Sequence, residues 1–203
     1  PGCGADVEAT PAWGKSFAVV KQYARDVAAA AGKALRSARV ADCTPLRAAF
    51  AAPPVRFGFL PPRVRKEDNA EGALASLAKA AGKVERNVME WQEAFKRGRL
   101  PETDPFRMHL VRIGSLIMAG LPAELFHDTG VDLSAAVRGT AMLTVSHAGG
   151  DVGYLPRRFA YKHLTYEVTD AFQWYRTAGA LVPATEPAVR KVVAAEARKL
   201  ISA

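Results

Sequence analysis

The 203-residue sequence has few cysteines and no long apolar run, and both absences narrow what the chain can be. Its two cysteines, Cys3 and Cys43, allow one disulfide at most and match no metal-binding spacing, so they do not decide the compartment. No stretch approaches the roughly 20 apolar residues that a membrane-spanning helix needs, and no signal peptide is visible. Because the sequence begins at Pro1 rather than Met, we expect its true start, with any targeting segment, to have been lost or cleaved.

Several motifs of common enzymes are also missing. Gly2-Cys3-Gly4 has the first two glycines of a dinucleotide fingerprint, but the third glycine and the preceding strand are absent. There is no phosphate-binding loop of the glycine-lysine-serine type and no Gly-x-Ser-x-Gly elbow. The sequence therefore does not support common nucleotide or serine-hydrolase chemistry.

The charge is unbalanced toward the basic side. The 28 Lys and Arg residues exceed the 20 Asp and Glu residues, which gives a net charge of +8 and disposes the surface toward phosphate, acidic glycan or anionic lipid. These basic residues are scattered, and no aromatic-interleaved motif accompanies them, so we expect a solvated surface and no nucleic-acid partner. The hydrophobic content of 49% is enough for one domain with a real core.

Apolar residues at helical spacing predict long amphipathic helices. The helices are expected after Thr10 as far as Leu35, from about Glu67 to Gly98, and from Thr185 to Leu200. The first should bury one apolar stripe. The stripe of the second resembles a coiled-coil repeat, but we favour packing on its own domain over a partner-binding seam.

Other segments are predicted to be strands. Residues 37–66 carry five prolines, so they cannot be a helix, and the alternation of Val55, Phe57 and Phe59 predicts one short strand in an irregular connection. Apolar runs predict three further strands, at 108–113, 115–119 and 141–146, and residues 124–137 have helical spacing. Strands and helices in this order predict an α/β fold with a layered mixed sheet flanked by long amphipathic helices.

Two of the four histidines have ordinary structural interpretations. His109 lies within an apolar strand, where a histidine is usually packed and hydrogen-bonded. His163 and Glu167 have i,i+4 spacing, but the intervening Thr165 and Tyr166 favour an extended segment. Neither pattern predicts a metal ligand.

The other two histidines lie near possible partners. His127 follows Glu124 by three residues on one helical face, as in carboxylate-histidine metal sites, but without a second such pair we favour coincidence. His147 adjoins Ser146, and neighbours in a strand point to opposite faces, so they cannot form a serine-histidine pair. A catalytic zinc normally takes three or more protein ligands, with imidazole common among them.

Glu124 and Tyr154 are the strongest candidates for chemistry. Glu124 follows an apolar strand and the break that Pro122 forces, so its side chain should emerge at the rim of the sheet. The alternative interpretation, without a functional role, is that Glu124 is an acidic residue in the first turn of a helix. Tyr154 lies in a turn that Pro156 closes, where a tyrosine is most often a packed aromatic. A carboxylate and a phenol so placed can converge on one ion.

The order of the motifs resembles a known family. Gly-Leu-Pro-Ala-Glu at 120–124, Gly-Tyr-Leu-Pro at 153–156 and Tyr-Glu at 166–167, after two long helices, are similar to the catalytic domain of neutral/alkaline non-lysosomal ceramidases. The resemblance covers most of this chain but only the later half of the family's domain. It implies that residues 1–203 are a single partial domain, the C-terminal part of a ceramidase-like catalytic domain whose N-terminal half is missing here.

The resemblance also implies a function. In the family, the residues matching Glu124 and Tyr154 bind the catalytic zinc with two upstream histidines, which would precede Pro1, and Gly2 stands where the family has a serine nucleophile. The chain is thus expected to be part of a zinc-dependent amide hydrolase that uses a metal-activated water, with Tyr154 also catalytic, a lipid-like or other amide substrate, and secretion or a periplasmic location. The alternative is a non-catalytic basic module that keeps the hydrolase fold and binds anionic lipid, such as a membrane surface, or glycan.

Overall fold

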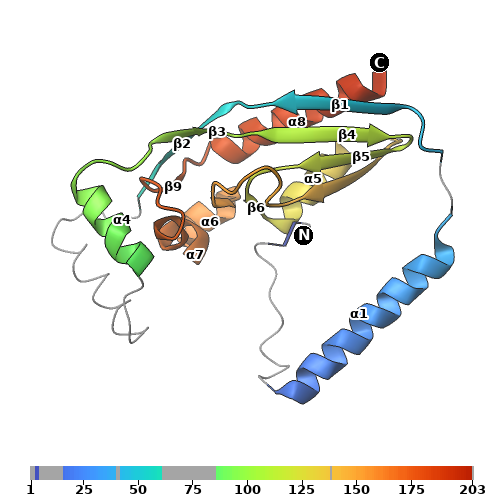
Figure 1. Cartoon of the computed structure of the whole chain (residues 1–203), viewed down its shortest axis with the longest axis horizontal. Helices are drawn as coiled ribbons and strands as arrows, with labels where there is room; N and C mark the ends of the chain where they lie inside the picture. Colours follow the sequence, from blue (N-terminus) through green and yellow to red (C-terminus); the bar gives the residue numbers. More distant parts are fainter. Residues whose placement is uncertain (1–2, 5–15, 40–41, 61–85, 138, 203) are drawn as a thin grey trace.

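The centre of the molecule is a mixed sheet. The computed structural model describes residues 3–4, 16–39, 42–60, 86–137 and 139–202. Its largest sheet has the strand order β1-β4-β5-β7 (Figure 1) and consists of β1 (Leu46–Ala51), β4 (Met108–Ile113), β5 (Leu116–Gly120) and β7 (Ala141–Val145). β4 is antiparallel to β1 and β5, whereas β7 is parallel to β5. The predicted strands at 108–113, 115–119 and 141–146 and the α/β class are confirmed.

The tight turn between β4 and β5 depends on a glycine. Gly114 has a φ of +58°, and a Cβ added there would lie 1.9 Å from the backbone oxygen of Asp42. A side chain would therefore displace the segment that leads into β1, and only glycine adopts this conformation without strain.

The segment with five prolines contains two strands rather than one. β2 (Pro54–Phe59) confirms the predicted strand, but β1 was not predicted. Pro45 and Pro53 flank β1 without interrupting it, and proline is tolerated at the ends of strands and at sheet edges. The prolines thus exclude a helix here without excluding an edge strand.

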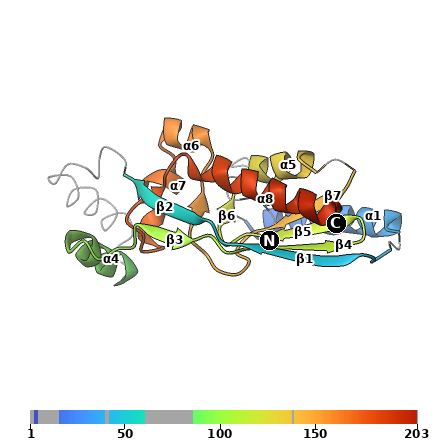
Figure 2. The same ribbon diagram turned by 90° about the horizontal axis from the view of Figure 1, so that it is seen from above.

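Helices cover one face of the four-stranded sheet. α8 (Thr185–Ser202) contacts β1 and β4, α5 (His127–Ala135) contacts β7 and α8, and Figure 2 shows both helices on the same side of the sheet. Met108 and Leu110 are fully buried, whereas His109 between them is exposed, as expected for a strand with one covered face. Each large apolar side chain buried in this layer contributes about 1.5–3 kcal/mol.

The opposite face of the sheet is apolar and exposed within the described part of the chain. Leu46, Phe50 and Leu143 are 72%, 59% and 48% exposed on it. His109 lies there with its ring 5.0 Å from that of Phe50. A Cβ added at Gly149 would lie 2.9 Å from His109 Nε2, so the ring packs against Phe50 and Gly149 although the side chain is exposed.

Two smaller sheets and a second core lie beside the first. One sheet has the order β3-β2-β9, with β3 (Thr103–Pro105) and β9 (Ala180–Leu181), and the other pairs β6 (Glu124–Leu125) with β8 (Tyr154–Leu155). Next to them lie α4 (Arg86–Lys96), α6 (Arg158–His163), α7 (Tyr166–Thr169) and the 3-10 helix η2 (Ala171–Gln173). Trp91 of α4 is buried in this second core and donates its indole N–H to the Thr177 carbonyl at 2.8 Å.

The predicted long helices are confirmed with different boundaries or burial. α8 matches its prediction, and α4 matches the end of the second helix, whose residues 67–85 lie outside the described residues. α1 (Phe17–Ser37) is a helix, but none of its residues is buried. The prediction that this helix buries an apolar stripe is therefore wrong for residues 17–37. No helix in the described ranges is both long and apolar enough to span a membrane.

Two short segments depart from their predicted conformations. Residues 124–137 were predicted as one helix, but Glu124 and Leu125 pair with β8 and the helix begins at His127. Thr165 and Tyr166 were predicted to favour an extended segment. Thr165 is extended, but Tyr166 begins α7, after α6 has ended at His163 and Leu164 has entered the left-handed region. At Glu124 and Leu125, pairing with β8 overrides the local sequence pattern.

Candidate functional site

Glu124 and Tyr154 lie side by side. They are register partners in the parallel pair β6–β8, and the Glu124 N–H donates to the Gly153 carbonyl at 2.9 Å. Glu124 is partly buried just beyond the end of β5, as the rim position predicted from Pro122 requires. The structure thus brings together the two residues that the sequence motifs single out, although 29 residues separate them along the chain.

The loop after β7 wraps around the segment that carries Glu124. Four backbone hydrogen bonds hold the two together: Leu121 N to Val145 O at 2.9 Å, His147 N to Ala123 O at 3.3 Å, Ala148 N to Leu121 O at 3.0 Å and Val152 N to Pro122 O at 2.7 Å. This wrapping places the whole loop, rather than Tyr154 alone, around the carboxylate.

Two tyrosine hydroxyls converge on Glu124. The Tyr175 hydroxyl donates to Glu124 Oε1, and the rings of Tyr154 and Tyr175 meet edge to face with centroids 6.2 Å apart. Burial raises the pKa of both phenols, and their hydrogen bonds to Glu124 and its negative charge raise it further. Both tyrosines therefore stay protonated at neutral pH and act as hydrogen-bond donors.

Sequence reasoning missed Tyr175, which follows η2 and belongs to no recognisable motif. Its position depends on Gly153, which has a φ of +90° and whose added Cβ would lie 2.9 Å from the Tyr175 ring. The glycine of the Gly-Tyr motif thus lets the aromatic ring approach the backbone beside Tyr154. This contact marks Tyr175 as part of the site, and no pattern in the sequence indicates it.

A histidine and a second carboxylate complete the surroundings of Glu124. His147 Nδ1 lies 2.9 Å from Asp151 Oδ2. Donor atoms of Glu124, His147 and Asp151 all lie within 4.8 Å of one another. His147 is exposed while the preceding Ser146 is buried, in line with the prediction that these neighbours point apart. Sequence reasoning did not connect His147 with Glu124 or Asp151.

His127, the histidine that follows Glu124 by three residues, lies elsewhere. His127 is exposed at the start of α5, and the group of possible metal ligands that the structure describes around Glu124 contains His147 instead. The i+3 spacing of Glu124 and His127 does not place them on one face of a helix, because Glu124 belongs to β6. His163 is also exposed, in the last turn of α6.

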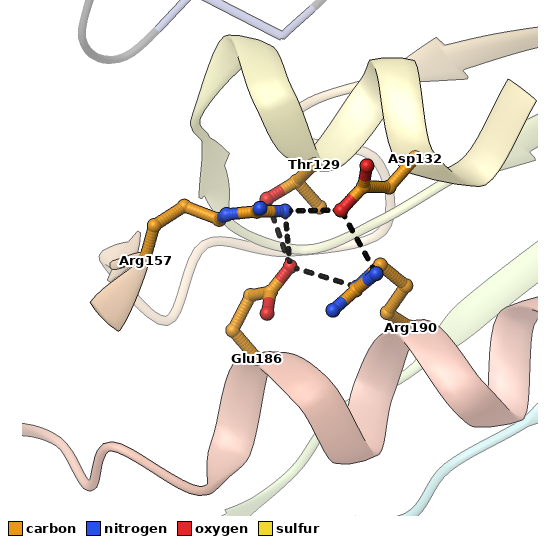
Figure 3. A network of polar contacts seen from close by, with 5 residues as sticks. All are labelled: Thr129, Asp132, Arg157, Glu186 and Arg190. Atoms are coloured by element: carbon orange, nitrogen blue, oxygen red, sulfur yellow. Dashed lines mark hydrogen bonds and ion pairs between the residues drawn. The ribbon is translucent and has the colours of Figure 1, made fainter. Parts of the chain in front are cut away.

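A charged network anchors the segment that follows Tyr154 (Figure 3). Arg157 Nη1 lies 2.7 Å from Asp132 Oδ2 on α5 and 3.2 Å from Glu186 Oε1 at the start of α8. Arg190 contacts the same two carboxylates, and the Thr129 hydroxyl donates to Glu186 at 3.1 Å. Because Arg157 is only three residues beyond Tyr154, the network ties the β6–β8 pair to the two helices that cover the main sheet.

A small pocket adjoins the two tyrosines. Tyr154 and Tyr175 line it together with apolar side chains, among them Phe57 and Phe172, and with the polar side chains of Glu167 and Thr177. The pocket has room for about one water molecule.

The donor set suits a metal of the zinc class. Zn²⁺ is bound in proteins by imidazole nitrogen and carboxylate oxygen, and the described residues supply both beside the phenol of Tyr154. Glu124 already has close polar neighbours on two sides, so its oxygens are directed into the group rather than into bulk solvent.

Comparison with known proteins gives limited similarity. No protein-family model and no curated protein matches the chain. Among solved structures, the chain is similar to the neutral ceramidase from Pseudomonas aeruginosa, with a TM-score of 0.39 and 20% identity over 73% of this chain and 27% of that one. A second ceramidase, solved as a complex, gives a TM-score of 0.34 and 23% identity over 47% of this chain and 14% of that one. The chain thus spans about a quarter and about a seventh of their lengths.

Proposed function

We propose that this chain is part of a zinc-dependent amide hydrolase of the ceramidase-like kind, with Glu124 and Tyr154 as metal ligands. The observation that carries the proposal is the pairing of these two residues across β6 and β8, from motifs that are far apart in sequence. Had their oxygens pointed apart across packed apolar atoms, the two motifs would have had no common site.

Residues of this chain would have different roles at the metal site. A bound zinc ion supplies a Lewis acid and an activated water for attack on an amide carbonyl. Glu124 and Tyr154 would hold the ion, since they are register partners in β6 and β8. As a ligand, Tyr154 would lie beside the metal-bound water and would also stabilise the oxygen on which negative charge develops. Tyr175 fixes the orientation of the Glu124 carboxylate by donating to it.

The same proposal implies a substrate class, a cover for the exposed sheet face and a location. The substrate of this proposal is a lipid-like or other amide, as the resemblance to the ceramidase family implies. The exposed sheet face with Leu46, Phe50 and Leu143 would be covered by the N-terminal half of the domain, which would also supply the upstream histidines. Secretion or a periplasmic location belongs to this proposal as well.

The test is zinc content and amide hydrolysis of the full-length protein, with a fatty-acyl amide as substrate. In Tyr154→Phe we expect kcat/KM to fall by about 10²–10³, the usual effect of removing one donor from a developing oxyanion. The matched control is Tyr166→Phe, since Tyr166 packs edge to face on Tyr154 but is itself half exposed. Equal activity of Tyr154→Phe and the control would overturn the role of Tyr154, and full activity after zinc removal would overturn the function.

A second candidate function rests on α1. Its apolar side chains recur at helical spacing and remain exposed, among them Phe17 at 85%, Val27 at 58% and Leu35 at 77%. The opposite side of this helix carries its basic residues, Lys21, Arg25, Lys33 and Arg36, against one acid, Asp26. An amphipathic helix with a basic polar face suits an anionic membrane surface. The alternative function is therefore a basic module that binds anionic lipid.

Vesicle binding tests this alternative in the full-length protein. We expect co-sedimentation with phosphatidylserine vesicles, little with phosphatidylcholine vesicles, and weakening by salt because screening reduces the attraction. Replacing Val20 and Val27 together by serine should lower partitioning at least about tenfold, since each buried side chain contributes about 1.5–3 kcal/mol. Ala29→Ser, on the basic side, is the control. Protection of α1 from proteolysis without vesicles would instead mean that the rest of the protein covers this helix.

A further inference from the structure

We infer that the outer surface of α6 docks on an anionic lipid bilayer beside the candidate site. This α6 surface consists of five exposed residues: Arg158, Phe159, Lys162, His163 and Leu164. The inference deepens the proposed function, and it rests on that function only in the claim that the neighbouring site acts on a lipid-like amide. Binding of the α6 surface to a bilayer can be measured without any hydrolysis.

Two large apolar side chains of the α6 surface face outward. Phe159 is 41% exposed and Leu164 is 45% exposed, whereas Ala160 between them is buried. The Tyr161 hydroxyl donates to the Leu181 carbonyl at 2.7 Å, which anchors the inner side of α6 to β9. Figure 2 shows α6 at the outer margin of the molecule. The helix therefore presents apolar side chains to the outside from a fixed base.

Leu164 occupies a backbone position that does not favour leucine. It ends α6 in the left-handed region, with a φ of +50°, and the Thr165 N–H donates to the Ala160 carbonyl at 3.1 Å. Helices that end in this way usually have glycine or asparagine at the left-handed position, because a larger side chain is strained there. Since Leu164 is exposed in the described part of the chain, burial does not offset this strain. A strained residue without a structural benefit points to a function of its side chain.

The charges of the α6 surface suit an anionic bilayer. Arg158, Lys162 and His163 lie on α6, which contains no acidic residue. One Lys or Arg near anionic headgroups strengthens binding about fivefold. Apolar and aromatic side chains beside such cations enter the boundary between headgroups and acyl chains. The α6 surface combines both kinds of side chain.

The α6 surface adjoins the candidate site. Phe159 packs on Phe126, which follows β6, with ring centroids 5.5 Å apart. Beyond Leu164, Tyr166 packs edge to face on Tyr154 of β8 and is hydrogen-bonded to Trp174, which is 40% exposed. Lipids bound at α6 would therefore lie beside both strands of the β6–β8 pair.

Co-sedimentation of the full-length protein with phosphatidylserine vesicles tests the inference. Leu164→Asn suits the left-handed backbone, so this variant should unfold at no lower a temperature than the wild type. We expect it to bind the vesicles about tenfold more weakly, because a polar amide replaces the apolar side chain. Lys162→Gln should weaken binding about fivefold, since it removes one cation.

Met89→Gln is the matched control, because Met89 is an apolar residue of α4 that is 56% exposed. Its vesicle binding should match the wild type. Equal binding by Leu164→Asn, Lys162→Gln and the control would overturn the inference. A lower unfolding temperature of Leu164→Asn would also overturn it, since the rest of the protein would then cover α6.

Hydrolysis separates the inference from the proposed function. For a fatty-acyl amide embedded in phosphatidylserine vesicles, kcat/KM of Leu164→Asn should fall by the same factor as vesicle binding. Hydrolysis of this substrate at the wild-type rate by Leu164→Asn would overturn the inference and leave the proposed function standing. Vesicle binding that depends on Leu164 in a protein without amide hydrolysis would support the α6 surface and overturn the proposed function.

Discussion

Replacing Glu124 by glutamine is expected to remove bound zinc and to lower kcat/KM for amide hydrolysis by at least about 10³-fold. Loss of an outer partner of a metal ligand already costs about 10–100-fold, and Glu124 is proposed as a direct ligand. The substitution keeps the shape of the side chain but removes the negative charge that attracts the ion. Zinc content by elemental analysis and steady-state kinetics measure the two effects together.

Glu124→Gln should nevertheless fold, because the amide oxygen still accepts the Tyr175 hydroxyl. We expect the free energy of unfolding to change by no more than about 1.5 kcal/mol, the net value of one ordinary hydrogen bond. Glu167→Gln is the matched control: Glu167 lines the neighbouring pocket but lies outside the group of possible metal ligands among the described residues. Unchanged zinc content in Glu124→Gln would refute the proposed metal ligand.

Replacing Arg157 by methionine is expected to lower the free energy of unfolding by roughly 2–3 kcal/mol. Glu186 is only 3% exposed and would lose one of its two cationic partners. Removing one member of a buried ion pair typically costs 3–5 kcal/mol, and Arg190 still compensates part of the charge here. Urea denaturation measures the difference, with Arg158→Met as the control because Arg158 is exposed. Equal loss in both variants would refute the importance of the network.

The pH dependence of that difference has a defined sign. The hydrogen bond from Arg157 holds the pKa of Asp132 below its ordinary value, and the charges of Arg157 and Arg190 add to the effect although burial opposes it. A lowered pKa in the folded state means that the stabilisation is present above the ordinary value and is lost as pH falls through the lowered one. The difference in the free energy of unfolding between the wild type and Arg157→Met should therefore decrease in acid and stay constant near neutral pH.

The local patterns of the sequence predicted most elements correctly where a single rule applied. Apolar runs predicted β4, β5 and β7, alternation of apolar residues predicted β2, and helical spacing with a Thr-x-Pro start predicted α8. The predictions were wrong where a distant segment decides the outcome. Glu124 and Leu125 have helical spacing but pair with β8, and the apolar stripe of α1 has helical spacing but contains no buried residue.

The residues of the candidate site also fall into those that the sequence predicted and those that only the structure shows. The sequence determined that Glu124 and Tyr154 follow glycine and proline at the ends of apolar segments, because backbone breaks are a local property. Only the tertiary structure decided that Tyr175, His147 and Asp151 join Glu124, since their approach depends on a loop that wraps β6 and on a glycine that admits an aromatic ring. Which side chains converge depends on which distant segments pack together in the fold. The order of residue types along the chain does not specify that packing.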